Sequence, residues 1–230
     1  MGYRKTPLIE GEYYHVYNRG NSKQNIFLDN EDRDRFVKLL YLCNSERGVN
    51  FRDDIVDKAI DVWDFNRERA IVSIGAWVLM PNHFHIYVTS KSLPEDRPRG
   101  DESTITEFMR KLSTGYSSYF NKKYNRTGSL FEGRFKATHV SGDIHAKYLF
   151  SYIHLNPVKL IDAKWKDNGI KNIPHAVKYL EGYQWSSYKD HAGVNRNENL
   201  IISLQDFPEY FASKAAVKNE IFEWLSLSKD

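Results

Sequence analysis

The feature that most constrains the fold is a pair of apolar segments joined by a Pro81-Asn82 turn. Residues 71–79 before the turn and 83–88 after it both read as strands, so a β-hairpin is expected here. Successive side chains on a strand point to opposite faces, which places His83 and His85 on one face. Two imidazoles on one face can bind one metal ion. A histidine pair on an apolar strand is, however, more often a structural feature.

The remaining sequence predicts alternating strands and helices. Residues 12–18 alternate as a strand, with His15 and two tyrosines on one face, and Asp29 or Asn30 caps a helix that extends to about residue 44. Residues 46–70 are highly charged and are interpreted as a partly helical insertion without an assigned function. A polar, proline-containing loop is expected over 91–101.

The second half of the core is predicted to be helix, strand and helix. Residues 104–107 have the form of a capping box, and apolar residues recur at helical spacing up to Phe120. Gly128 ends this segment, and residues 130–140 alternate as a strand that places Arg134 and Lys136 on the same side. Ser141 or Asp143 then caps a helix that Pro157 closes.

Composition limits the class of protein. A chain of 230 residues with 41% hydrophobic residues is long enough for one principal domain. No run of about 18 apolar residues is present and the first residues lack a signal-peptide pattern, so no membrane contact and a cytoplasmic location are expected. Cys43 is the only cysteine, which excludes an internal disulfide and a thiolate-rich zinc cluster.

Positive charge is concentrated in one segment, although the net charge is only +3. Seven basic residues and one acid, Glu132, lie between Arg110 and Lys136, interleaved with aromatic residues. Basic groups that neutralise phosphates, beside rings on which bases stack, are typical of surfaces that bind single-stranded nucleic acid. A solvated helix face with a core stripe explains the same pattern equally well.

The helix of residues 144–156 carries a second set of polar groups. Tyr152 and Asn156 are four residues apart and lie on one face, whereas His154 points to another side and is expected to make a structural hydrogen bond. From periodicity alone, Tyr152 would more often be a tyrosine at the edge of the core.

Six segments, taken in order, resemble the single-tyrosine HUH transposases of the insertion-sequence and REP-associated type. Together they extend over most of the range 12–190, which makes them more specific than a histidine pair alone. They are YHVYNRGN at 14–21, MPNHFH at 80–85, YFN at 119–121, GSLFEGRFK at 128–136, YIHLNPVK at 152–159 and WSSY at 185–188.

The resemblance implies an α+β fold with a ferredoxin-like or RRM-like core, in which helices pack on one face of an antiparallel sheet. It also implies a transposase that cleaves and rejoins single-stranded, hairpin-associated DNA through a 5′-phosphotyrosine intermediate. Tyr152 would be the nucleophile. His83, His85 and Asn156 would bind a divalent metal ion, Mg or Mn, with water and the phosphate completing the coordination. Tyr116 and Tyr119 remain rival nucleophiles.

The DNA contacts, domain limits and alternative functions are expectations of the same kind. Exposed basic residues near the site are the candidate DNA-binding groups, namely Arg19, Arg126, Arg134, Lys136 and Lys159. The catalytic domain is expected to span 1–190, with the charged insertion at 46–70 and a helical C-terminal extension at 191–230. A homodimer is one alternative that the sequence leaves open. A non-catalytic hairpin-DNA-binding protein and a metal-dependent nuclease that activates water are alternative functions.

Overall fold

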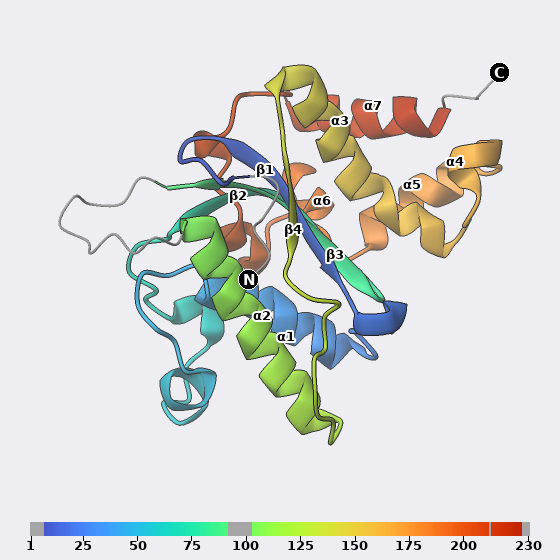
Figure 1. Ribbon diagram of the computed structural model, residues 1–230. Helices are drawn as coiled ribbons and strands as arrows, with labels where there is room; N and C mark the ends of the chain where they lie inside the picture. Colours follow the sequence, from blue (N-terminus) through green and yellow to red (C-terminus); the bar gives the residue numbers. More distant parts are fainter. Residues whose placement is uncertain (1–6, 92–102, 212, 227–230) are drawn as a thin grey trace.

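The computed structural model describes residues 7–91, 103–211 and 213–226, so most of the predicted 91–101 loop lies outside the described residues. Figure 1 shows a central sheet with helices on both sides. The strands are β1 (Tyr13–Arg19), β2 (Val72–Met80), β3 (His83–Ser90) and β4 (Lys136–His139). The longer helices are α1 (Asn30–Leu42), α2 (Thr104–Lys123), α3 (Gly142–Leu155), α5 (Ile173–Gly182) and α7 (Lys214–Ser226).

Short helical segments connect these elements. The α-helical ones are α4 (Trp165–Asn168) and α6 (Tyr188–His191). The others are η1 (Asn21–Lys23), η2 (Arg52–Val56), η3 (Val62–Asp64), η4 (Asn156–Leu160), η5 (Asn197–Ile201) and η6 (Leu204–Asp206). The charged insertion contains η2 and η3, as the sequence predicted.

The sheet is antiparallel, with strand order β2-β3-β1-β4. Combined with the chain order β1-α1-β2-β3-α2-β4, this is the topology of a ferredoxin-like fold. The predicted α+β class is therefore confirmed. In the register of β1 and β3, Arg19 lies opposite His83 and Tyr17 lies opposite His85.

The first face of the sheet packs against α1 and α2. Every second residue of β3, beginning at Phe84, joins Val16 of β1 in one buried cluster with the apolar faces of these two helices. Asp29 caps α1 by accepting a hydrogen bond from the Asp32 amide, and Asp32 bonds back to complete a capping box. The cap of α2 is Ser103, one residue before the predicted box.

The second face is covered as well, although helices on one face were expected. The α3 helix packs on β2 and β3, and α5 and α7 join the same buried cluster (Figure 1). The reason is that Ala76 and Val78 of β2, with Tyr87 of β3, make this face apolar as well. Apolar side chains on both faces of a strand require a layer on each side. The α3 helix is thereby held against β2 and β3, directly above the alternate residues of β3.

Two predicted boundaries in the second half are wrong. The strand expected over 130–140 is reduced to β4, because Gly133 has a φ of 140° and interrupts the extended backbone. Arg134 therefore precedes the strand. The apolar residues between 207 and 224 predict a terminal helix there, but this helix begins only at Lys214. In the described part of the chain, no helix is both long and apolar enough to cross a membrane.

Candidate active site

The two predicted ligand histidines occupy the first half of β3 on the face that α3 covers. Their ring centroids are 5.0 Å apart and the rings are nearly perpendicular. His85 is buried, with 6% of its surface exposed, and His83 is half-buried at the end of the hairpin turn. The alternation of the strand thus brings both imidazoles to one place, as predicted.

Hydrogen bonds to the Nδ1 atoms orient both rings. His83 Nδ1 lies 2.6 Å from Asn82 Oδ1, and His85 Nδ1 lies 2.8 Å from His15 Nε2 of the neighbouring strand. An amide oxygen can only accept, so Nδ1 of His83 donates and its Nε2 carries the lone pair. His85 Nε2 is buried and has no hydrogen-bond partner within the described residues.

The environment keeps these imidazoles neutral. Burial lowers the pKa of His83 to about 4, with Lys159 and Arg19 adding to the effect. Burial likewise places the pKa of His85 well below its usual value, and it lowers the pKa of His15 to about 4. Neutral imidazole is the form that ligates metal ions, so no proton has to be displaced near neutral pH.

The two histidines fit a divalent metal ion. The decisive observation is the unpartnered, buried Nε2 of His85, since a buried polar atom without a partner is costly unless something binds it. Imidazoles held through Nδ1 are also the usual arrangement of metal-binding histidines. No group of three or more His, Cys, Asp or Glu side chains suited to a metal ion occurs among the described residues. Further ligands would therefore be oxygen atoms from other sources.

Tyr152 lies on the second half of α3, with its ring over the histidines. Its centroid is 5.4 Å from that of His85 and 6.0 Å from that of His15, both in edge-to-face geometry. Two ammonium groups approach the same ring, Lys166 Nζ at 4.4 Å and Lys159 Nζ at 5.8 Å from the centroid. Burial raises the pKa of Tyr152, partly offset by a hydrogen bond from Asn156.

Asn156, the predicted third metal ligand, is fully buried at the C-terminal end of α3. Its Nδ2 donates to the Tyr152 carbonyl at 2.9 Å, and its Oδ1 accepts from Lys159 Nζ at 3.3 Å. Asn156 thus links the helix end to Lys159, and metal ligation by its side chain stays a prediction.

The rival tyrosines and His154 lie elsewhere. Tyr116 is fully buried on the first face, where its hydroxyl donates to the Ile26 carbonyl, and the Tyr119 hydroxyl donates to Asp32 on the same side. The sheet separates both from the histidines. His154 Nε2 bonds to Ser187 Oγ at 2.8 Å, in agreement with the structural role expected from its direction on the helix.

The candidate DNA-binding residues divide into two groups. Arg19 and Lys159 lie near the histidines, and Arg19 forms an ion pair with Glu132. Lys136 is exposed and lies opposite Tyr17 of β1, on the same face of the sheet as His85. Arg126 instead lies over the Phe120 ring, 5.5 Å from its centroid, and Arg134 is exposed in the loop before β4.

Several aromatic residues of the basic segment are unsuited to base stacking in this structure. Tyr116, Phe120 and Phe131 are all buried in the core beneath the first face. Their helical and alternating spacing reflects packing, the second of the two explanations that the sequence left open.

Comparison with solved structures gives distant likenesses. A solved structure of a REP-associated tyrosine transposase bound to a REP hairpin has a TM-score of 0.48 and 16% sequence identity, covering 86% of this chain and 90% of that chain. No family model and no curated protein matches the sequence. The likeness is too weak to indicate what this chain does.

Sequence reasoning missed two residues of the site. His15 was placed on a strand face, but its pairing with His85 depends on which strands are neighbours, and a single sequence does not specify this. Lys166 belongs to α4, which was not predicted, and reaches Tyr152 because the chain turns back after η4. The alternation of Tyr13, His15 and Tyr17 was the only available signal for the first.

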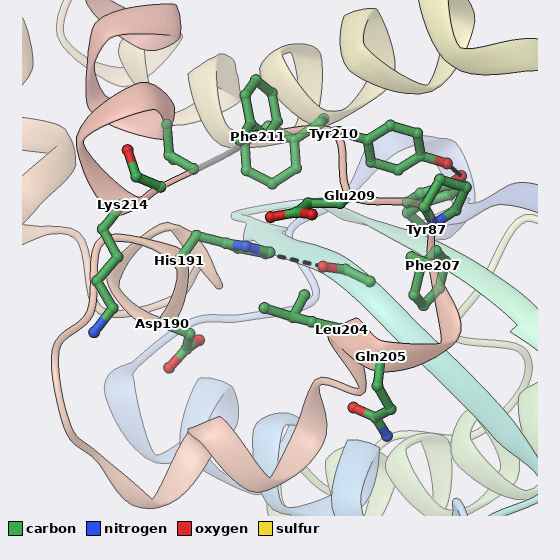
Figure 2. A pocket seen from close by; sticks show the side chains of 15 residues that line it. Tyr87, Asp190, His191, Leu204, Gln205, Phe207, Glu209, Tyr210, Phe211 and Lys214 are labelled. Carbon is green, nitrogen blue, oxygen red and sulfur yellow. Dashed lines mark hydrogen bonds between the residues drawn. The ribbon is translucent and has the colours of Figure 1, made fainter.

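A pocket also lies elsewhere on the second face, and neither Tyr152 nor the histidines of β3 line it. It has a volume of about 450 Å³ and lies between the sheet and residues 204–217 (Figure 2). His191 points into it and bonds to the Gly75 carbonyl at 2.9 Å, while Tyr87 and Tyr210 join their hydroxyls at 2.8 Å. Its lining combines five tyrosine and phenylalanine rings with polar and charged side chains.

Proposed function

We propose that this chain is a metal-dependent, single-tyrosine DNA strand transferase that acts on single-stranded DNA next to a hairpin. The observation that carries the proposal is the position of Tyr152, whose ring lies 5.4 Å from that of His85, beside the unpartnered His85 Nε2. A phenol and a cation site from two separate elements are the minimum needed for this chemistry. The six ordered motifs support the same assignment.

His83 and His85 would hold the cation through their Nε2 atoms. When bound, a divalent ion supplies Lewis-acid polarisation of the scissile phosphate and stabilises charge on the leaving oxygen. The protein contributes two fixed, neutral imidazoles, so its part of the site needs no rearrangement. Phosphate and water oxygens would supply the remaining ligands.

Tyr152 would attack the phosphorus through its hydroxyl oxygen. The new bond joins this oxygen to phosphorus, and the bond from phosphorus to the 3′ oxygen breaks. The phenolic proton is transferred, in net terms, to the departing 3′ oxygen. The products are a 5′-phosphotyrosine and a free 3′ hydroxyl, and the covalent bond retains the energy needed to join a second strand.

The lysines near Tyr152 would counteract the effect of burial on its hydroxyl. An ordinary tyrosine has a pKa near 10, and burial raises the value further for Tyr152, which disfavours the phenolate. Lys166 and Lys159, whose ammonium groups are near the ring, favour negative charge on the hydroxyl as it forms. They also favour the approach of a phosphate.

The decisive experiment looks for the covalent intermediate. The purified protein is incubated with a set of labelled hairpin oligonucleotides, each carrying a single-stranded tail of randomised sequence, in the presence of Mn²⁺ or Mg²⁺. After denaturation, we expect a metal-dependent protein–DNA adduct, and Tyr152→Phe should abolish it because no other residue takes over the attack.

Tyr148→Phe is the matched control, since it removes a hydroxyl one turn earlier on α3 and should leave the adduct intact. An adduct that persists in Tyr152→Phe would overturn the assignment of the nucleophile. Cleavage without any adduct would favour the nuclease that activates water, and binding without cleavage would favour the non-catalytic DNA-binding protein.

A further inference from the structure

A second, smaller pocket of about 270 Å³ adjoins Tyr152 on the side of α4 and α7. Aromatic rings form most of its lining, and Leu155, Lys166 and Gly169 complete it. The rings are those of Tyr148, Tyr152, Trp165 and Trp224. The volume is just below the range of about 300–1,000 Å³ that is usual for ligand pockets. It therefore suits one flat group of the size of a nucleobase.

The rings are held in place rather than collapsed onto one another. Tyr148 and Tyr152 are nearly parallel with centroids 6.3 Å apart, and Trp224 meets Tyr148 edge to face at 5.6 Å. Trp224 Nε1 donates to Glu220 Oε1 at 2.8 Å, and the same oxygen accepts from Ser151 of α3 at 3.1 Å. Glu220 thus fixes the α7 indole against α3.

Two of the residues that line this pocket carry polar groups. Trp165 is 7% exposed, and its Nε1 is buried with no hydrogen-bond partner in the part of the chain that the structure describes. An indole N–H is a donor only, so it requires an acceptor such as a base carbonyl or ring nitrogen. Lys166 adds a positive charge that suits the phosphate attached to such a base.

From these contacts we infer that the pocket binds one unpaired nucleobase of the DNA strand, adjacent to the phosphate that Tyr152 attacks. The inference rests on the proposed function, because Tyr152 is a wall of the pocket as well as the nucleophile. Rings stack on any base, and the Trp165 N–H would favour bases that present an acceptor at that position. The inference also gives α7, in the C-terminal extension, a role in binding the substrate.

The test compares hairpin oligonucleotides whose single-stranded tails carry the same phosphates with and without bases. Four tails each contain one base type, and a fifth consists of abasic residues. Affinity is measured by fluorescence anisotropy in EDTA, so that metal-dependent cleavage does not interfere. We expect the best base-containing tail to bind about 5- to 150-fold more tightly than the abasic tail, which is the usual effect of stacking.

Trp224→Leu and Tyr148→Leu should remove most of that preference and leave the affinity for the abasic tail unchanged. Trp224→Phe retains an aromatic face and should keep it. Phe222→Leu is the matched control, because Phe222 belongs to the same helix, is 52% exposed and does not line the pocket. Thermal melting verifies that each variant is folded.

Equal affinity of the wild-type protein for all five tails would overturn the inference, as would a base preference that both leucine variants retain. Either result can occur while the Tyr152 adduct still forms, in which case only the pocket assignment fails. If the adduct never forms but the base preference is lost in the leucine variants, the pocket stands as a binding site and the strand-transfer proposal fails.

Discussion

His15 is hydrogen-bonded to His85 and can orient its ring. His15 Nε2 is 2.8 Å from His85 Nδ1, so it can accept the Nδ1 proton and leave His85 Nε2 with a lone pair for the proposed cation. Residues that orient metal-binding histidines in this way typically change metal affinity 10- to 100-fold when removed. His15 is thus a positioning residue for His85.

Replacing His15 by Phe should therefore weaken Mn²⁺ binding by about 10- to 100-fold, while His85→Ala should abolish it. Isothermal titration of the DNA-free protein measures both effects without any need for catalysis. His139→Phe is the control, since His139 is also a strand histidine but contacts Tyr14 and Glu12, away from the site. Unchanged Mn²⁺ affinity in His15→Phe would rule out the positioning role.

Residue directions could be predicted from the sequence wherever one regular element determined them. The 3.6-residue period separates Tyr152 from His154, and the two-residue period brings His83 and His85 together. In the structure His154 bonds to Ser187, and the rings of His83 and His85 lie 5.0 Å apart, with that of His85 beside Tyr152. The side-chain bonds of Asn156 to Tyr152 and Lys159 depend on the turn into η4, which periodicity does not describe.

At the scale of elements, the N-terminus of α1 and the C-terminus of α2 share one charged cluster. Asp32 is fully buried and accepts hydrogen bonds from the Leu28 amide, the Tyr124 hydroxyl and Lys123 Nζ. Lys123 also bonds to Asp29, the α1 cap. This lysine, counted in the basic segment that the sequence suggested for nucleic acid, therefore stabilises the packing of two helices.

Lys123→Met should lower the free energy of unfolding by about 2 kcal/mol, the usual cost of losing hydrogen bonds to a buried charged group. Lys122→Met, at the adjacent exposed position, should change it by less than about 0.5 kcal/mol. Urea denaturation measures both. Affinity for hairpin DNA should be the same in the two folded variants. A selective loss of DNA affinity in Lys123→Met would show that the basic-segment interpretation was right for this residue.

The predicted strand at 130–140 illustrates where element prediction fails. The alternation over residues 130–140, with Arg134 and Lys136 on one side, suggested a continuous strand. Only residues 136–139 pair with β1, apart from an isolated bridge between Phe131 and Gly20. Gly133 adopts a φ that favours glycine, and the backbone leaves the sheet there. Apolar spacing indicates which residues are buried, whereas strand pairing also requires a regular backbone. Residues of this loop can therefore be buried without belonging to a strand.

At the scale of the whole molecule, the two faces of the sheet carry different features. The first face, with α1 and α2, contains the larger part of the aromatic core, and the second face carries the histidines below α3. The sequence identified the components of the site, but their meeting depends on the strand order β2-β3-β1-β4 and on α3 lying on the second face. Those are long-range features that no local pattern encodes.

Two buried histidines on the second face, outside the proposed metal site, should make the fold less stable in acid. His154 and His191 have ring centroids 5.1 Å apart in the core between α3 and α6. Burial lowers the pKa of His191 to about 4, although its bond to the Gly75 carbonyl opposes the shift, and burial places the pKa of His154 well below its usual value. Unfolding restores values near 6.5, so the unfolded chain binds more protons between pH 6.5 and 4.

The free energy of unfolding should therefore be fully retained above pH 6.5 and fall as the pH is lowered toward 4. Protonation of His191 alone should lower it by roughly 3 kcal/mol. Urea denaturation at pH 7, 5.5 and 4.5 in EDTA measures the slope without bound metal. His191→Gln, which keeps a donor for the Gly75 carbonyl but cannot titrate, should reduce the slope, and the other buried and half-buried histidines should account for what is left. His175→Gln, at an exposed position of α5, should leave the slope unchanged. If His191→Gln has the same slope as the wild-type protein, His191 is not a source of the acid sensitivity, which then comes from other groups such as His15, His83 and His154.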